Sequence, residues 1–516
     1  MTMTTATEPT TAEPVPPLIH QAVARQAELR PEATAIVFRE ERIDYATLNA
    51  AAEHIAAELA ALGAGPGIVV PVRMPRTPQL LAVLLGVLKC GAAYAAFDHR
   101  WPAERVDGLL AQLRPPVFVT AEHPSSDELT VWQPPVEPLS AVARLGGTSP
   151  AAAVDPASPA SVFFTSGTTG TPKGVVSPHR ATTRLFGPGG LLGYRPGGVT
   201  PQAAPCAWDA FSLEVWGMLC TGGTTVIVEE DYLLPGALRD LVKSTGMDTV
   251  FLTCGLFNLF VDMDLDCFAG TRQVFTGGER ISVDHVRRFL ERHPAVVLFN
   301  VYGPVESCVY ATQHVITVED LETPGGIPIG VAVAGTEVLV LDAEGKLCAP
   351  GVEGEVCVAG DGLAVEYLGL PELTAEKFPL VTPTDTEVRV YRTGDLGFHD
   401  ENGVLHFRGR ADRQVKVRGF RIEPGEIETA ATRIEGVARC TVVPVPGRMA
   451  AWERLALFYV PSVAGTEGDD PAGVAAELIR TLPPYLVPDA VLAVPEFPMT
   501  VNGKVDNQAL LALLPS

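Results

Sequence analysis

The sequence predicts an α/β protein with two parts: a large N-terminal domain of doubly wound mixed sheets with helices, and a small, mobile α+β C-terminal domain. Three observations support this prediction: a length of 516 residues, alternating helical and strand patterns, and a change of character near residue 404. A chain of this length ordinarily forms more than one domain. We expect a flexible tail over residues 1–14, the main domain over 15–411 and the C-terminal domain over 412–516.

Helical and strand patterns alternate in the N-terminal part. Apolar residues recur at helical spacing over residues 48–62 and 80–88, and a glycine follows each run closely. Short runs of β-branched and other apolar residues, which are typical of buried strands, occupy residues 68–70, 162–164, 226–228 and 296–298. This alternation indicates a sheet covered by helices.

A different pattern begins beyond residue 404. The stretch 407–413 is short, polar and basic, and residues 414–418 then alternate as a half-exposed strand. A helix is expected over 426–434, with Pro424 at its entry and Gly436 after it. We therefore place the domain boundary here.

Composition excludes several classes of function. The net charge of −23 argues against a nucleic-acid partner, since binding phosphates requires clustered Lys and Arg. Nine cysteines without a C-x-x-C spacing suggest neither a zinc site nor a disulfide framework. The densest apolar stretch, 80–88, is far below the roughly 18 residues that span a bilayer, and the N-terminus lacks a signal pattern. We expect a cytoplasmic protein without a membrane partner.

A loop built for phosphate follows the strand at 162–164. Its glycines let backbone N–H groups approach an anion, its hydroxyls add donors, and its lysine adds a positive charge. Pro172 and Gly174 on either side of the lysine exclude a Walker loop. The residues that we expect to bind phosphate are Thr165, Ser166, Gly167, Thr168, Thr169, Gly170 and Lys173.

With this loop, the chain resembles the adenylate-forming superfamily, in particular the amino-acid adenylation domains of nonribosomal peptide synthesis. The resemblance covers nearly the whole chain, from residues 43–48 and 88–94 to 502–506. It implies ATP and Mg²⁺ as cofactors, with the loop closing over the β- and γ-phosphates and Lys173 acting in catalysis.

The resemblance also assigns the other nucleotide residues. The segment 300–306 follows a buried strand, where α/β sheets bind ligands. There Tyr302, followed by Gly303, stacks on adenine, Asn300 recognises the edge of the base, and Glu306 binds Mg²⁺. Val305 stands where the family usually has Thr, so one hydroxyl is missing.

Further positions follow in the second half of the chain. Asp395 accepts hydrogen bonds from the ribose hydroxyls, a bidentate role that suits a carboxylate. Arg410 reaches the nucleotide, Asp412 is the hinge, and Phe407 replaces a family Tyr near the nucleotide. Lys504 is the catalytic lysine, which bridges the substrate carboxylate and the ribose.

The resemblance places Asp209 opposite a substrate ammonium group. An unpaired buried carboxylate is unfavourable, so an apolar neighbourhood implies a cationic ligand or a raised pKa. None of the other pocket positions is charged, which favours a small neutral amino acid: alanine first, then glycine, serine or 2-aminobutyrate. Whether the amine is α or β to the carboxylate stays open. These positions are Ala210, Leu213, Leu252, Phe275, Gly277, Val301, Val309 and Tyr310.

The expected partner is a discrete phosphopantetheinylated carrier protein. A basic cluster around the hinge is a candidate landing site for it, with a solvated strand face as the alternative. One alternative function is an acyl- or aryl-CoA ligase, which has no use for Asp209; another is a nucleotide-binding protein without catalysis. The cluster consists of Arg408, Arg410, Arg413, Lys416, Arg418 and Arg421.

Overall fold

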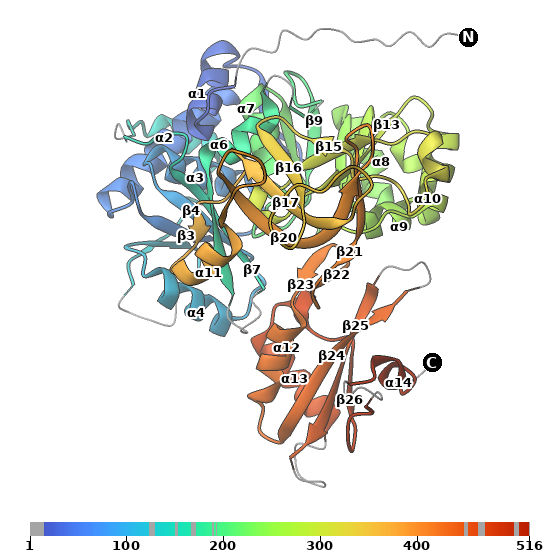
Figure 1. Cartoon of the computed structure of the whole chain (residues 1–516). Helices are drawn as coiled ribbons and strands as arrows, with labels where there is room; N and C mark the ends of the chain where they lie inside the picture. Colours follow the sequence, from blue (N-terminus) through green and yellow to red (C-terminus); the bar gives the residue numbers. More distant parts are fainter. Residues whose placement is uncertain are drawn as a thin grey trace, which may run out of the picture.

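A computed structural model of the chain describes residues 15–122, 129–149, 153–166, 172–187, 190–191, 193–447, 452–462, 470–499 and 505–514. A large N-terminal body and a smaller C-terminal domain are joined by a narrow connection (Figure 1). The expected tail, 1–14, lies outside the described residues.

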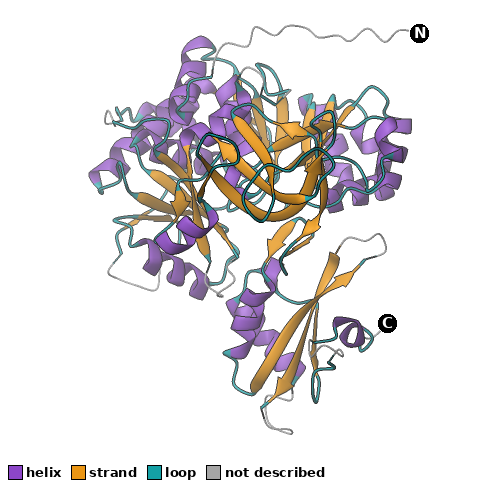
Figure 2. Ribbon diagram, in the orientation of Figure 1, coloured by secondary structure: helices purple, strands orange, loops and turns teal. Residues whose placement is uncertain are grey.

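One seven-stranded sheet with helices around it forms much of the N-terminal body (Figure 2). Its strand order is β18 (Glu366–Tyr367), β8 (Lys173–Pro178), β7 (Pro159–Thr165), β4 (Ala93–Phe97), β3 (Val69–Arg73), β5 (Phe118–Thr120) and β6 (Val131–Trp132). The strands from β7 to β6 pair in parallel, whereas β8 and β18 are antiparallel. The two helical patterns of the sequence form α2 (Tyr45–Ala61) and α3 (Pro78–Lys89), whose apolar side chains are buried.

Two further sheets complete the α/β part of this body. The first has the order β2 (Glu41–Asp44), β1 (Thr34–Phe38), β10 (Thr224–Ile227) and β9 (Val199–Gln202). The second has the order β11 (Thr249–Thr253), β12 (Gln273–Gly277), β13 (Val297–Tyr302), β14 (Thr312–Val315) and β15 (Val331–Ala332). Because β11, β12 and β13 are parallel, their carboxyl ends meet at one edge, where open α/β sheets bind ligands.

Helices cover these sheets along the chain. They are α1 (Ile19–Leu29), α4 (Ala103–Leu113), α5 (Leu139–Arg144), α6 (His179–Thr183), α7 (Met218–Thr221), α8 (Pro235–Thr245), α9 (Cys254–Asp264), α10 (Val283–Arg292) and α11 (Pro371–Lys377). A π-helical turn, Leu213–Gly217, precedes α7. In the described residues, no helix is long and apolar enough to cross a membrane.

An antiparallel sheet lies between the α/β part and the C-terminal domain (Figure 1). Its order is β16 (Thr336–Leu341), β17 (Gly354–Gly360), β20 (Val388–His399) and β19 (Leu380–Val381), and β21 (Leu405–Arg410) also pairs with β20. The β20–β21 register sets Asp395 opposite Arg410. Two expected nucleotide residues are therefore neighbours on this sheet.

The C-terminal domain is a sheet with helices on both faces. Its order is β23 (Phe420–Ile422), β22 (Val415–Val417), β25 (Trp452–Pro461) and β24 (Val437–Pro446), and β26 (Ala490–Ala493) pairs with β25. One face packs on α12 (Pro424–Thr432) and α13 (Pro471–Thr481), and the other packs on α14 (Asn507–Leu511). The expected boundary at 411/412 falls between β21 and β22, and the expected helix at 426–434 is α12, which begins two residues earlier.

Candidate active site

The two ends of the phosphate loop are fixed by a strand pair. Thr165 on β7 and Lys173 on β8 are register partners. Lys173 is buried, and its Nζ lies 5.1 Å from the ring centroid of Tyr367. Burial and the charge of Arg421 lower the pKa of Lys173. Gly167, Thr168, Thr169 and Gly170 lie outside the described residues.

A hydrogen-bonded chain of side chains forms the nucleoside side of the site. Tyr302 Oη donates to Asp395 Oδ2 over 2.6 Å, and Arg410 Nη1 donates to Asp395 Oδ1 over 2.6 Å. Arg410 also binds Asp412, which ties the expected hinge residue to the site. Phe407 packs against the cluster that contains Tyr302. The structure thus brings these expected residues together.

Two other expected nucleotide residues shape the end of β13. Asn300 is buried, and its Nδ2 donates to the carbonyl of Pro328 over 2.8 Å, which fixes the direction of the amide. A Cβ on Gly303 would lie 2.4 Å from the carbonyl oxygen of Val309. Only glycine fits this close backbone approach.

Glu306 is a fully buried carboxylate at the centre of the site. Tyr367 Oη donates to its Oε1 and Arg421 Nη1 donates to its Oε2, both over 2.7 Å. Burial alone would raise the pKa of Glu306, but the charges of Arg421 and Lys173 lower it to about 2. Mg²⁺ commonly binds one or two carboxylates together with substrate phosphates, so a single ionised carboxylate beside a phosphate loop fits this ion.

Asp209 is a buried carboxylate with few partners. It is 4% exposed, and its Oδ2 accepts a hydrogen bond from the backbone N–H of Val309 over 3.0 Å. Cys308 and Val309 both have positive φ angles, 52° and 67°, a conformation that is unusual for a β-branched residue. The strained turn directs this N–H at Asp209. Desolvation by burial raises the pKa of Asp209 to about 6.

Most of the expected amino-acid pocket forms one apolar cluster around Asp209. This cluster contains Ala210, Leu213, Phe275, Val301, Val309 and Tyr310. Gly277 is in contact with it, because a Cβ there would lie 2.1 Å from the carbonyl oxygen of Val301. A narrow cavity of about 70 Å³ reaches Asp209, Val309 and Tyr310 from the nucleoside side.

Leu252 does not belong to this cluster. It packs on the other face of β11, in the core with Phe257 and Ile281. The ring centroid of its neighbour Phe251 lies 6.0 Å from those of Trp208 and Tyr310. Neighbouring residues of a strand face opposite sides, so Phe251 rather than Leu252 contacts this cluster, while both residues line the cavity between the domains.

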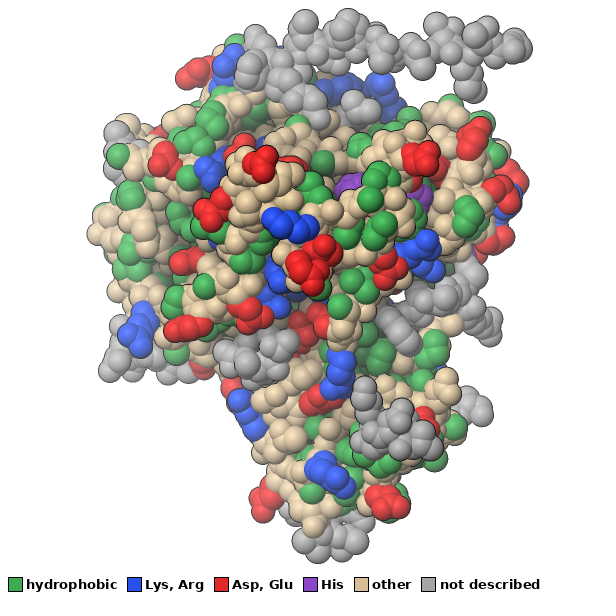
Figure 3. All heavy atoms as spheres, in the orientation of Figure 1, with side chains coloured by type: hydrophobic (Ala, Val, Ile, Leu, Met, Phe, Trp, Pro, Cys, Tyr) green, Lys and Arg blue, Asp and Glu red, His purple; other side chains and the backbone are tan. Residues whose placement is uncertain are grey.

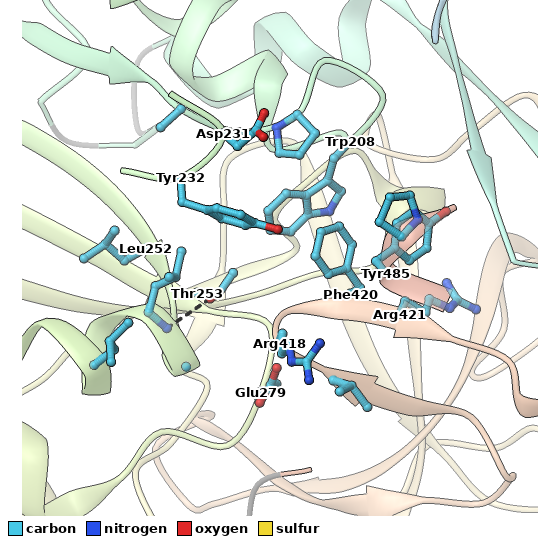
Figure 4. Close-up of a pocket in the computed structure, with 18 of the residues that line it drawn as sticks. Trp208, Asp231, Tyr232, Leu252, Thr253, Glu279, Arg418, Phe420, Arg421 and Tyr485 are labelled. Carbon is cyan, nitrogen blue, oxygen red and sulfur yellow. Dashed lines mark hydrogen bonds between the residues drawn. The ribbon is translucent and has the colours of Figure 1, made fainter. Parts of the chain in front are cut away.

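A hairpin of the C-terminal domain enters the site, which the sequence did not reveal. Phe420 stacks on Tyr485 at 4.6 Å and lies 6.1 Å from Trp208 of the N-terminal body (Figure 4). The backbone N–H of Gly419 donates to Glu279 Oε1. A cavity of about 1050 Å³ between the two domains is lined by Trp208, Glu279, Phe420 and Tyr485, among others.

The expected basic landing site consists largely of cations that already have partners within this chain, and its role stays a prediction. Four of its six cations pair with carboxylates of this chain: Arg410 with Asp395, Arg413 with Glu428, Arg418 with Asp489 and Arg421 with Glu306. The Arg408 guanidinium lies over the ring of Phe398, and Lys416 lines the narrow cavity. On the face shown in Figure 3, acidic and basic side chains are mixed over both domains.

Lys504 lies outside the described residues, but its neighbours are described. Met499 and Val505 form a β-bridge, and Val505 packs on the face of the C-terminal sheet that carries α14. The β22–β23 hairpin and α12 lie toward the N-terminal body, where Arg105 pairs with Glu426. The domain therefore turns its hairpin, rather than the residues that flank Lys504, toward the site.

These features define an adenylate-forming enzyme. The family model described as AMP-binding enzyme matches residues 23–368, and the model of the AMP-binding enzyme C-terminal domain matches residues 426–504. The chain belongs to this family, whose adenylation enzymes use ATP with Mg²⁺. Within it, the chain is similar to the adenylation domains of nonribosomal peptide synthetases.

The matched synthases are much longer proteins, and this chain spans only a small part of each. Bacitracin synthase 1 of Bacillus licheniformis is 35% identical over 95% of this chain, which spans 9% of that protein. Tyrocidine synthase 3 of Brevibacillus parabrevis is 34% identical over 95% of this chain, which spans 8% of it. A solved structure of holo-PA1221, described as containing adenylation and PCP domains, matches with a TM-score of 0.85 and 34% identity, over 96% of this chain and 84% of that one.

Proposed function

We propose that this protein activates a small neutral amino acid, alanine first, with ATP to give an aminoacyl-adenylate and pyrophosphate. It then transfers the aminoacyl group to the phosphopantetheine thiol of a discrete carrier protein. The observation that carries this proposal is Asp209, a buried carboxylate with a raised pKa that lies beside an apolar cluster and is reached by a narrow cavity. A substrate ammonium group would supply the charge that this carboxylate lacks.

In the first half-reaction, the substrate carboxylate attacks the α-phosphorus of ATP, and the bond to pyrophosphate breaks. Asp209 orients the amino acid through its ammonium group, and Lys173 with the loop holds the phosphates. Tyr302 and Asp395 hold adenine and ribose, and Lys504 bridges the substrate carboxylate and the ribose. Mg²⁺ at Glu306 would neutralise the phosphate charge.

The pocket supports a small substrate. Phe275 stacks on Phe299 at 4.6 Å, and Tyr310 and Val301 close the same cluster. Ala210 contributes only a methyl group to this cluster, and the larger side chains around it are buried. A well-packed wall would exclude a longer side chain by steric overlap.

In the second half-reaction, the thiol attacks the acyl carbonyl and AMP leaves. Support comes from the interdomain cavity, which is large enough for an extended arm and is lined by Trp208, Thr253, Phe420 and Tyr485. Holo-PA1221, with its adenylation and PCP domains, supports a carrier as the partner.

The test is ATP–pyrophosphate exchange with α-amino acids, β-amino acids and matched acids that lack the amine. Exchange confined to small amino acids is expected. Exchange with acids that lack the amine would instead identify an acyl- or aryl-CoA ligase, for which Asp209 has no partner. A carrier assay by intact mass, with phosphopantetheinylated carrier protein, tests the second step.

A further inference from the structure

The buried Glu306 binds a cation that comes from the other domain. Its Oε1 accepts from Tyr367, which belongs to the N-terminal body, whereas its Oε2 accepts from Arg421 on β23 of the C-terminal domain. In the described residues, the ion pair of Glu306 is with Arg421. The orientation of the C-terminal domain is therefore linked directly to the expected metal ligand.

Arg421 makes two further contacts in this position. Its Nη2 donates to Tyr391 Oη over 3.4 Å, and its backbone carbonyl accepts from Ser166 Oγ over 3.1 Å. Its side chain is 15% exposed, against 0% for Glu306. The guanidinium is thus a largely buried cation inside the site.

Mg²⁺ and Arg421 would compete for the same oxygen. Mg²⁺ needs an octahedral shell at about 2.0–2.1 Å and keeps several waters or phosphate oxygens around it. The Arg421 guanidinium, 2.7 Å from Oε2, occupies the space that this shell requires. A third cation beside Lys173 and Arg421 would also add like-charge repulsion in a buried site.

We propose that Arg421 is a positioning residue that replaces Mg²⁺ on Glu306, so that the hairpin can enter the site only after the metal has left. The proposal rests on the metal-binding role that the proposed function gives to Glu306. Because a buried carboxylate without a cation is strongly unfavourable, Glu306 accepts Arg421 when the metal departs with pyrophosphate. The two half-reactions are thereby ordered by exchange of one cation for another.

The experiment measures the orientation of the C-terminal domain with and without Mg²⁺ at a fixed concentration of ATP, because Mg²⁺ binds a carboxylate together with substrate phosphates. Glu104 on α4 and Arg480 on α13 form an exposed ion pair across the two domains at 2.7 Å. Glu104→Cys with Arg480→Cys allows a short bis-maleimide to trap this orientation, and exposed pairs of this kind contribute little to stability. Proteins that carry only one of the two introduced cysteines measure the background crosslinking of the native thiols, seven of which are buried.

We expect the crosslinking rate to fall severalfold as MgCl₂ replaces choline chloride at constant ionic strength. In the Glu306→Gln protein, this response to Mg²⁺ should disappear. In the Arg421→Gln protein, crosslinking should be low at every Mg²⁺ concentration, and Arg421→Lys should restore part of it. Arg418→Gln is the matched control: it removes the same charge from the same hairpin, but its partner Asp489 lies within the C-terminal domain.

Two results would overturn the proposal. One is crosslinking of the parent protein that Mg²⁺ does not change, and the other is an equal Mg²⁺ response in the Glu306→Gln protein. Pyrophosphate exchange, measured in parallel, tests the proposed function separately: exchange that needs Mg²⁺ and Glu306, together with an unresponsive orientation, would refute only the cation exchange. Circular dichroism confirms that each variant is folded.

Discussion

Replacing Asp209 by Asn should make the free protein more stable and the enzyme much less active. Burial raises the pKa of Asp209 from 3.8 to about 6, a shift of about 2 units. At about 1.36 kcal/mol per unit, the ionised carboxylate destabilises the free folded protein by up to ~3 kcal/mol. Because the folded pKa is raised, this destabilisation is absent below pH 3.8 and fully developed above about pH 6. Asparagine keeps the acceptor for the Val309 N–H and removes the charge.

The same substitution leaves the substrate ammonium group without a counter-charge. Breaking a buried ion pair costs about 3–5 kcal/mol, which corresponds to a loss of about 10²- to 10⁴-fold in kcat/KM for the amino acid. The assays are thermal unfolding at pH 8 and pyrophosphate exchange with the preferred amino acid. KM for ATP should change little, since the nucleoside residues are untouched.

Glu214→Gln provides a matched control. Glu214 is also a buried carboxylate, and burial raises its pKa to about 8, but its Oε2 accepts from the backbone N–H groups of Ala203 and Ala204. Exchange should persist in this variant. An Asp209→Asn protein that keeps normal exchange, or that unfolds at a lower temperature than the parent at pH 8, would refute the reasoning.

Three other predictions follow from the site. KM for the amino acid should rise about tenfold per pH unit below about pH 6, because a protonated Asp209 cannot pair with the ammonium group; a KM that is constant from pH 7 to pH 5 would contradict this. Lys504→Ala should suppress exchange while ATP binding, measured by equilibrium dialysis, stays intact; equal loss of both would count against the assigned role. Gly419→Ala should slow aminoacyl transfer to the carrier about tenfold without reducing exchange. The φ angle of Gly419 is +83°, and a Cβ at this position would lie 2.4 Å from Thr253. The transfer is measured by the intact mass of the carrier.

The sequence predicted best what depends on local pattern. The buried residues of α2 and α3 were predicted from helical periodicity. Helix α2 buries one apolar face, and α3 is buried on nearly all sides. The ends of the phosphate loop were predicted because a strand pattern is followed directly by glycines and hydroxyl side chains. Tyr302 and Asp395 were expected on the nucleotide, and their contact agrees with that expectation, although their roles remain predictions.

Strand register was harder to predict. The run Thr249–Thr253 is largely buried on both faces, so alternation carries no signal for which residue faces the substrate. Leu252 is the residue expected in the pocket, whereas Phe251 contacts the apolar cluster around Asp209. Only the neighbouring rings, which come from distant parts of the chain, distinguish the two residues.

Charge pairing also depends on distant residues. The basic run after residue 407 looks like an exposed patch, but Arg421 meets Glu306 across 115 positions of sequence and Arg418 meets Asp489 across 71. Local sequence does not encode such partners. The stacking of Phe420 between Trp208 and Tyr485 was invisible for the same reason.

The two faces of the C-terminal sheet have a consequence for reversibility. The hairpin and α12 lie on the side of the N-terminal body, while Val505, the neighbour of Lys504, packs on the α14 side. A rigid body cannot present both sides at once. With Lys504 as the adenylating lysine, turning the hairpin inward withdraws the group that the back-reaction needs. Pyrophosphate in the cell would then no longer convert the aminoacyl-adenylate back to ATP and amino acid. The domain orientation would therefore favour the forward reaction.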